Sequence, residues 1–139
     1  MLINKKKIGL GEPVYLIAEI GSNHNQDKSL ALEMIDMAAE SGASAVKFQS
    51  IRFDKLYQPH YEKTEFKKWF RQIELDESWY QELAERAATV GVDFLSSPTY
   101  LEAIDLLEQC SVPAYKLASP QVQGNLDVVR RAAQTGKPL

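Results

Sequence analysis

The chain has 139 residues, of which 45% are hydrophobic and 25% charged, and a formal net charge of −3. This size allows one domain with its own core, and the acidic balance argues against a nucleic-acid partner, whose binders carry basic surfaces. A single cysteine, Cys110, excludes an intrachain disulfide, and no apolar run approaches the roughly 20 residues of a membrane span. We therefore expect a cytoplasmic protein with no membrane partner.

The first elements alternate between strand and helix. The apolar run 14–18 predicts a buried strand, which ends at Glu19. After a polar loop, apolar residues recur at helical spacing from Asp27, a predicted N-cap, to Gly42, a predicted helix end. Residues 45–49 predict the second strand.

Residues 50–75 predict a long charged insertion with one short helix at 65–71. A helix follows, capped by Asp76 and closed by Gly91, and residues 93–96 predict the third strand.

The last third of the chain repeats the pattern. Apolar spacing predicts a helix over 101–107, and residues 114–117 predict a fourth strand. Asn125 can cap a final helix that ends at Gly136.

Strands that alternate with helices imply a parallel α/β sheet with right-handed crossovers. An open doubly wound sheet and a (βα)8 TIM-type barrel both fit, and the absence of Gly-x-Gly-x-x-Gly after the first strand disfavours dinucleotide binding. A complete barrel needs roughly 250 residues. We therefore expect residues 1–139 to form about the first four βα units, or half of a barrel.

The active site of either architecture lies at the carboxyl ends of the strands. A lysine there needs an anionic partner or water, and nearby hydroxyls can complete a phosphate or carboxylate site. The strand ends thus predict a site for an anion, formed by Glu19, Lys47, Gln49, Ser96, Ser97, Lys116 and Ser119.

These residues also allow structural interpretations. Lys47 and Glu19 can form a structural ion pair, although Lys116 repeats the lysine placement two strands later and favours a ligand role. Ser97 and Ser119 each precede a proline and can be helix caps. His24, in the first strand-to-helix loop, has no second histidine or cysteine beside it, so the sequence predicts no metal site in this chain.

Four motifs together resemble the sialic acid synthase (NeuB-like) family. The first, Ile-Ala-Glu-Ile-Gly-Ser-Asn-His at 17–24, is similar to its Ala-Glu-Ile-Gly-x-Asn-His signature. The others lie at the second, third and fourth strands, at residues 42–49, 94–98 and 112–119, and the match continues at 125–126 and 135–138.

The resemblance implies a (βα)8 barrel that condenses phosphoenolpyruvate with an N-acetylated amino sugar, such as N-acetylmannosamine, to a sialic acid-type product. It places Glu19 beside the reacting carbons or a metal-bound water. It assigns the phosphate and carboxylate of phosphoenolpyruvate to Lys47, Ser97, Lys116 and Ser119, and the sugar to Asn23, His24, Gln49 and Gln121. A divalent metal, Mn²⁺ or Mg²⁺, is expected in the full-length enzyme, with ligands in later strands outside this chain, as is an antifreeze-like domain.

Two residues depart from the family pattern: Gln26 stands where glycine is usual, and Gln121 stands where a glutamate contacts the sugar. Two alternatives therefore stay open: a related phosphoenolpyruvate-condensing keto-sugar-acid synthase, and a non-catalytic half barrel that binds anions. Because a half barrel has unpaired strand edges, we also expect a homodimer or other self-association, and little synthase activity from the isolated chain.

Overall fold

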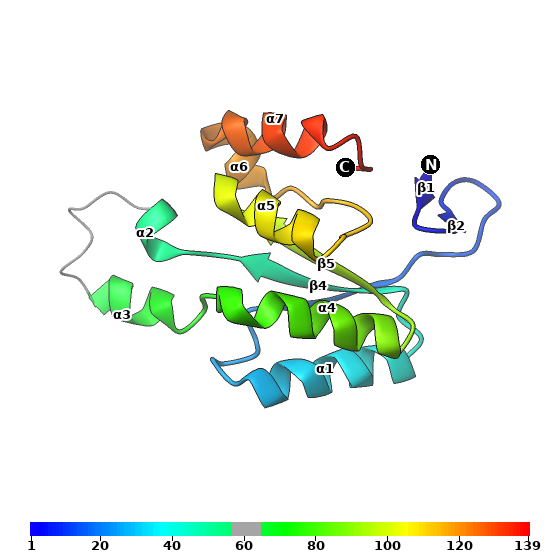
Figure 1. Ribbon diagram of the computed structural model, residues 1–139, viewed down its shortest axis with the longest axis horizontal. Coiled ribbons are helices and arrows are strands. Elements are labelled where there is room, and N and C mark those ends of the chain that lie inside the picture. Colours follow the sequence, from blue (N-terminus) through cyan, green and yellow to red (C-terminus); the bar gives the residue numbers. More distant parts are fainter. Residues whose placement is uncertain (57–64) are drawn as a thin grey trace.

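A three-stranded parallel sheet forms the centre of the structure, a computed structural model that describes residues 1–56 and 65–139 (Figure 1). The strands are β3 (Ile17–Gly21), β4 (Ala45–Ser50) and β5 (Asp93–Pro98), with β4 in the middle. The register pairs Glu19 with Lys47, and Gln49 with Ser97. A short antiparallel hairpin, β1 (Leu2–Ile3) and β2 (Lys6–Lys7), precedes the sheet.

Helices follow the strands as the alternation predicts. The long ones are α1 (Lys28–Glu40), α4 (Tyr80–Thr89), α5 (Leu101–Gln109) and α7 (Leu126–Gln134). The short ones are α2 (Phe53–Leu56), α3 (Glu65–Arg71), the 3₁₀ turn η2 (Glu77–Trp79) and α6 (Ser119–Gly124). The predicted helix at 65–71 is confirmed, while residues 57–64 of the predicted insertion lie outside the described part of the chain. No helix in the described ranges is long and apolar enough to cross a membrane.

Side-chain caps begin three helical segments at the predicted residues. The Asp27 carboxylate accepts hydrogen bonds from the backbone N–H groups of Ser29 and Leu30, at 2.8 and 3.2 Å. Asp76 caps η2, directly before α4, and Asn125 caps α7 in the same manner. These bonds satisfy N–H groups that the first helical turn leaves without partners, so a local signal sets where each segment begins.

The two faces of the sheet have different partners because successive strand side chains point in opposite directions. Val46, Phe48 and Phe94 belong to the main core, with the buried side chains Ile35 of α1, Leu83 of α4 and Ile104 of α5. On the opposite face, Ala45 and Leu95 cluster with Ile3 and Ala114. We call this second face, which also carries Lys47, the inner face.

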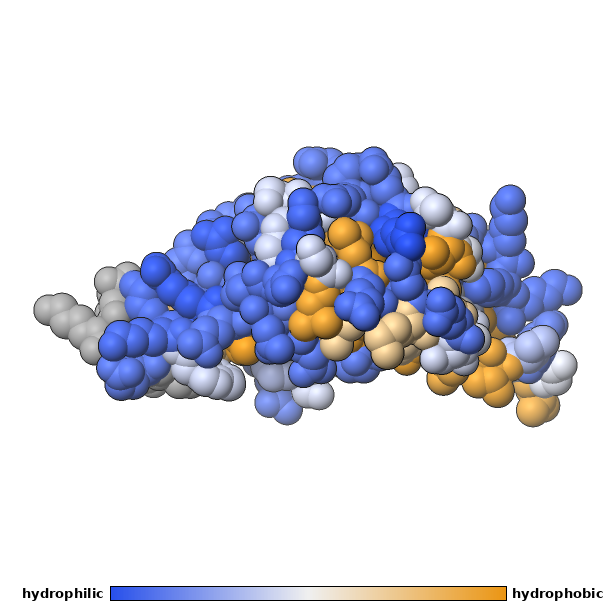
Figure 2. All heavy atoms as spheres, turned by 90° about the horizontal axis from the view of Figure 1, so that it is seen from below, coloured by the Kyte–Doolittle hydropathy of each residue, from blue (hydrophilic) through white to orange (hydrophobic). Residues whose placement is uncertain are grey.

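The first predicted strand is wrong in its position and burial. It begins at Ile17 rather than at residue 14, and Val14, Leu16 and Ile17 are all exposed. The reason is that β3 is an edge strand of the described sheet, paired only with β4. Apolar side chains therefore reach solvent along this edge, and apolar atoms also reach the surface on the side of α1 (Figure 2).

The predicted fourth strand at 114–117 is also wrong for the described structure, in which three strands form the parallel sheet. Pro113, directly before it, has no N–H to donate. The Tyr115 N–H donates to the Pro138 carbonyl, at 2.9 Å, instead of to β5. The segment still lies against the sheet, because Ala114 packs with Leu95.

Candidate functional site

Lys47 is the centre of the candidate site. It lies in the middle of β4 and is only 4% exposed. Its ammonium Nζ lies 2.5 Å from Glu19 Oε2 on β3 and donates to Ser97 Oγ on β5, at 3.3 Å. The parallel register creates this arrangement, because it sets the three strands side by side with these side chains on the inner face. The structural alternative for these two residues, a Lys47–Glu19 ion pair, is therefore present, and the ligand role that the sequence favours for Lys47 stays a prediction.

Gly21 lets Glu19 and Gln49 approach each other. The register of β3 shifts between Glu19 and Gly21, and Gly21 has a φ of +59°, in the left-handed region that favours glycine. A Cβ atom built there would lie 3.3 Å from Glu19 Oε1 and 3.6 Å from Gln49 Nε2. The carboxylate and the amide therefore converge over the Gly21 α-carbon, beside the Lys47 ammonium.

Lys116 does not belong to the main core. Its neighbours Tyr115 and Leu117 both pack with that core, whereas Ala114 packs on the inner face. Lys116 is exposed, and no ion pair in residues 1–56 and 65–139 includes it. Ser119, also exposed, is the first residue of α6.

Two other predicted residues, Asn23 and His24, do not join this cluster, and the side chain of a third lies outside the described part of the chain. Asn23 is exposed, and its amide donates back to the Ile20 carbonyl, at 3.0 Å. His24 is buried on the helix side of the sheet, where its ring faces Phe48. Gln121 lies in α6, and its side chain is outside the described structure.

His24 has the surroundings of a structural residue. It is 0% exposed, and its ring makes an edge contact with Trp79, with centroids 5.7 Å apart. Its Nδ1 accepts a hydrogen bond from the backbone N–H of Gln26, at 3.3 Å. Burial lowers the pKa of His24, because the charged ring would lose its hydration. A neutral His24 therefore shapes the β3–α1 loop from behind the sheet.

The cluster suits an anion better than a metal. Lys47 and Lys116 supply positive charge, and Ser97 and Gln49 supply groups that donate hydrogen bonds to phosphate or carboxylate oxygens. Glu19 is its one carboxylate and already pairs with Lys47. Within the described residues, no three His, Cys, Asp or Glu side chains are placed to hold a metal ion. The residues described thus do not by themselves fit the expected divalent metal.

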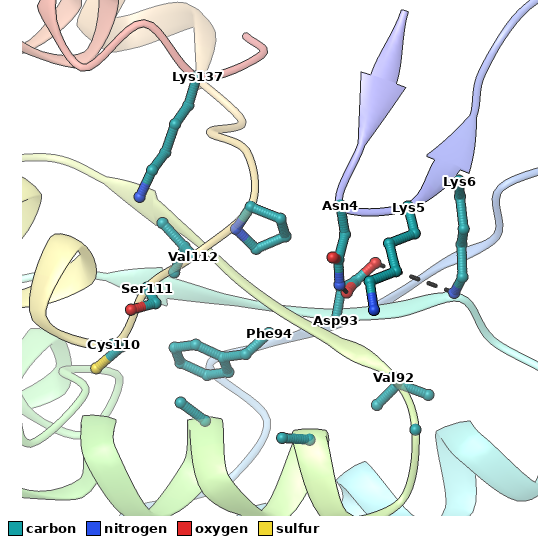
Figure 3. Close-up of a pocket in the computed structure, with 14 residues that line it drawn as sticks. Asn4, Lys5, Lys6, Val92, Asp93, Phe94, Cys110, Ser111, Val112 and Lys137 are labelled. Carbon is teal, nitrogen blue, oxygen red and sulfur yellow. Dashed lines mark hydrogen bonds and ion pairs between the residues drawn. The ribbon is translucent and has the colours of Figure 1, made fainter.

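A separate cavity of about 890 Å³ lies at the opposite, amino ends of the strands (Figure 3). Asp93, the first residue of β5, lies on its wall, and its carboxylate accepts hydrogen bonds from Asn4 and Tyr15, at 2.9 and 2.7 Å. The Asn4 bond anchors the β1–β2 hairpin at the amino end of β5. Active sites of parallel α/β proteins lie at the carboxyl ends of the strands, whereas this cavity lies at the amino ends. We therefore assign the candidate site to the Lys47 cluster.

Ser96, predicted as part of the anion site, instead lies on the helix side of the sheet with Phe94. Its hydroxyl shares a buried hydrogen bond with that of Ser50, at 2.8 Å, and Thr99 donates to the Ser50 carbonyl, at 2.7 Å. Ser50 and Thr99, which join the strand ends in this way, were not predicted from the sequence. The sequence signal for this network is weak, since the partners are about 50 positions apart.

Comparison with known proteins gives matches over almost the whole chain. Residues 34–139, more than half of the chain, match the model of the NeuB family. An uncharacterised protein of Methanocaldococcus jannaschii is 37% identical over 99% of this chain, and the pseudaminic acid synthase of Helicobacter pylori is 32% identical over 92%. The crystal structure of an N-acetylneuraminic acid synthetase from Leptospira borgpetersenii superposes with a TM-score of 0.82, at 31% identity over 94% of this chain.

The chain spans only part of these proteins. It covers 40% and 41% of the length of the two curated relatives and 47% of the Leptospira chain.

Proposed function

From the premise that the chain belongs to the NeuB family, we propose that it forms the phosphoenolpyruvate-binding part of a synthase for a nonulosonic acid. One observation carries the proposal: a buried lysine, Lys47, lies in the middle of a parallel sheet and is held between Glu19 and Ser97. The names of the relatives, which make pseudaminic and N-acetylneuraminic acids, support the product class.

In the proposed reaction, the methylene carbon of phosphoenolpyruvate attacks the aldehyde of an N-acetylated amino sugar and forms the new carbon–carbon bond. Water adds to the adjacent carbon, and inorganic phosphate leaves. Lys47 and Lys116 would hold the two anionic groups of phosphoenolpyruvate, with Ser97 and Ser119 as hydrogen-bond partners. Glu19 would accept the proton of the attacking water, because it lies beside Lys47 and is half exposed.

The sugar-binding part of the proposal rests mainly on Gln49. It lies beside Glu19 over Gly21, at the rim of the lysine cluster. Gln121, by its position in α6, is a second candidate, whereas Asn23 and His24 have other contacts, so we do not extend the proposal to them.

The experiment that tests the proposal is a chimera. This chain would replace the matching segment of the H. pylori pseudaminic acid synthase, and phosphate release would be measured from phosphoenolpyruvate with several N-acetylated amino sugars. We expect release from the chimera, little release from the isolated 139-residue chain, and loss of release with Lys47→Met. A folded chimera that binds phosphoenolpyruvate but releases no phosphate with any of these sugars would contradict the proposal.

A further inference from the structure

One short segment contacts the loop that follows each of the three parallel strands. It is the stretch 72–77, which follows α3 and ends on the first residue of η2, and we call it the brace. The strands carry the residues of the candidate site, but the loops after them lie far apart in the sequence. A segment that touches all three loops can fix their relative positions.

The contact with the loop after β3 comes from Gln26. Its side-chain amide donates to the backbone carbonyls of Gln72, at 3.4 Å, and of Glu74. Gln26 has a φ of +59° and follows Asn25, with a φ of +48°. Non-glycine residues in this region are strained and persist only where their surroundings stabilise them. The hydrogen bonds of Gln26 to the brace are such a stabilising contact.

The contact with the loop after β4 uses two carboxylates of the brace. The Glu74 carboxylate accepts a hydrogen bond from the backbone N–H of Phe53, the first residue of α2, at 2.6 Å. Glu77 Oε1 lies 3.2 Å from the guanidinium Nη1 of Arg52. The chain that leaves the middle strand is thus held at two successive residues.

Glu77 also makes the contact with the loop after β5. The hydroxyl of Tyr100 donates to the same Oε1 atom, at 2.8 Å, and Tyr100 is only 2% exposed. One carboxylate oxygen therefore joins the loops that follow two neighbouring strands. These strands carry Lys47 and Ser97, which contact each other across the sheet.

We propose that Gln26 and Glu77 are positioning residues, which hold the three strand ends in the geometry that binds the anionic substrate. The inference rests on the proposed function for its substrate, phosphoenolpyruvate. Its structural part, the coupling of the three loops through the brace, can be tested without any ligand.

The test compares two glycine variants. Gln26→Gly removes the link to the brace and also relieves a left-handed backbone, so the fold should be retained. Asn25→Gly is the matched control: it relieves the neighbouring left-handed residue, whose side chain makes no hydrogen bond within the described residues. The hydrogen-exchange rate of the Phe53 amide reports whether its hydrogen bond to Glu74 of the brace is intact. Calorimetric titration with phosphoenolpyruvate reports the affinity of the site.

We expect Gln26→Gly to speed exchange at Phe53 and to weaken phosphoenolpyruvate binding about three- to tenfold, as the loss of one or two hydrogen bonds predicts. Asn25→Gly should leave both unchanged. An exchange rate at Phe53 that is equal in Gln26→Gly and wild type would contradict the claim that the brace couples the loops. Faster exchange at Phe53 with unchanged affinity for phosphoenolpyruvate would contradict the positioning role of Gln26.

Glu77→Gln is a second variant, because it keeps the size of the side chain but removes its charge. It should weaken phosphoenolpyruvate binding by a similar factor. The control is Glu102→Gln, which removes a surface carboxylate paired with Lys55. If the wild-type chain does not bind phosphoenolpyruvate at all, the proposed function fails, while the exchange experiment still decides whether the brace exists.

Discussion

Replacement of Lys47 by methionine perturbs the candidate site at its centre. Methionine has nearly the length of lysine without its charge, and the position is only 4% exposed, so an apolar side chain can occupy it. Glu19, the partner of Lys47, is 52% exposed and can be hydrated by water once the ammonium is removed. We therefore expect the free energy of unfolding to change by no more than about 1 kcal/mol.

Binding of phosphoenolpyruvate should respond far more strongly. A hydrogen bond to a charged group contributes about 1.5–3 kcal/mol, and 1.4 kcal/mol corresponds to a factor of ten in Kd. Lys47→Met should therefore weaken binding about 10- to 150-fold, measured by isothermal titration calorimetry.

The control is Lys137→Met, because Lys137 is also partly buried and ion-paired, with Glu108 at 2.6 Å, but lies in the C-terminal segment. It should bind phosphoenolpyruvate as the wild type does. Equal affinity for wild type and Lys47→Met, or equal losses in the two variants, would refute the assignment of the site.

Three further predictions follow from particular contacts. Val14, just before β3, and Ile17 of β3 are exposed, and this edge has no strand partner in the described residues, so the purified chain should self-associate; light scattering that shows a monomer at high concentration would contradict this. Since burial lowers the pKa of His24, the unfolded chain binds its proton more readily; the free energy of unfolding should fall as pH drops below about 6.5, and urea titrations should show a smaller fall for His24→Asn. Gly21→Ala should destabilise the fold by about 1–2 kcal/mol and weaken phosphoenolpyruvate binding, because its Cβ would crowd Glu19; unchanged affinity and stability would argue against this geometry.

Local signals in the sequence predicted much of the fold. The caps at Asp27, Asp76 and Asn125 are correct because each depends on a side chain that bonds to N–H groups two or three residues away. The Lys47–Glu19 pair was predictable for a related reason: parallel strands bring their carboxyl ends to one edge, so residues at equivalent positions meet.

Non-local effects account for the errors. The sequence 114–117 has the composition of a strand, but a strand also needs a partner, and the Tyr115 N–H donates to Pro138 instead. His24 stands in a polar loop, yet the packing of Phe48 and Trp79 buries it. The Gln26 contacts join residues nearly 50 positions apart, and apolar periodicity carries no signal for them.

Binding of phosphoenolpyruvate at the Lys47 cluster can be tested directly by NMR, from the amide chemical-shift changes that follow its addition to the isotopically labelled chain. The amides of Gly21, Gln49 and Ser97, at the carboxyl ends of the strands, should shift. Those of Lys5 and Ser111, which line the cavity at the opposite ends, should not (Figure 3). Changes confined to that cavity, or no changes at millimolar ligand, would contradict the claim that the Lys47 cluster binds this substrate.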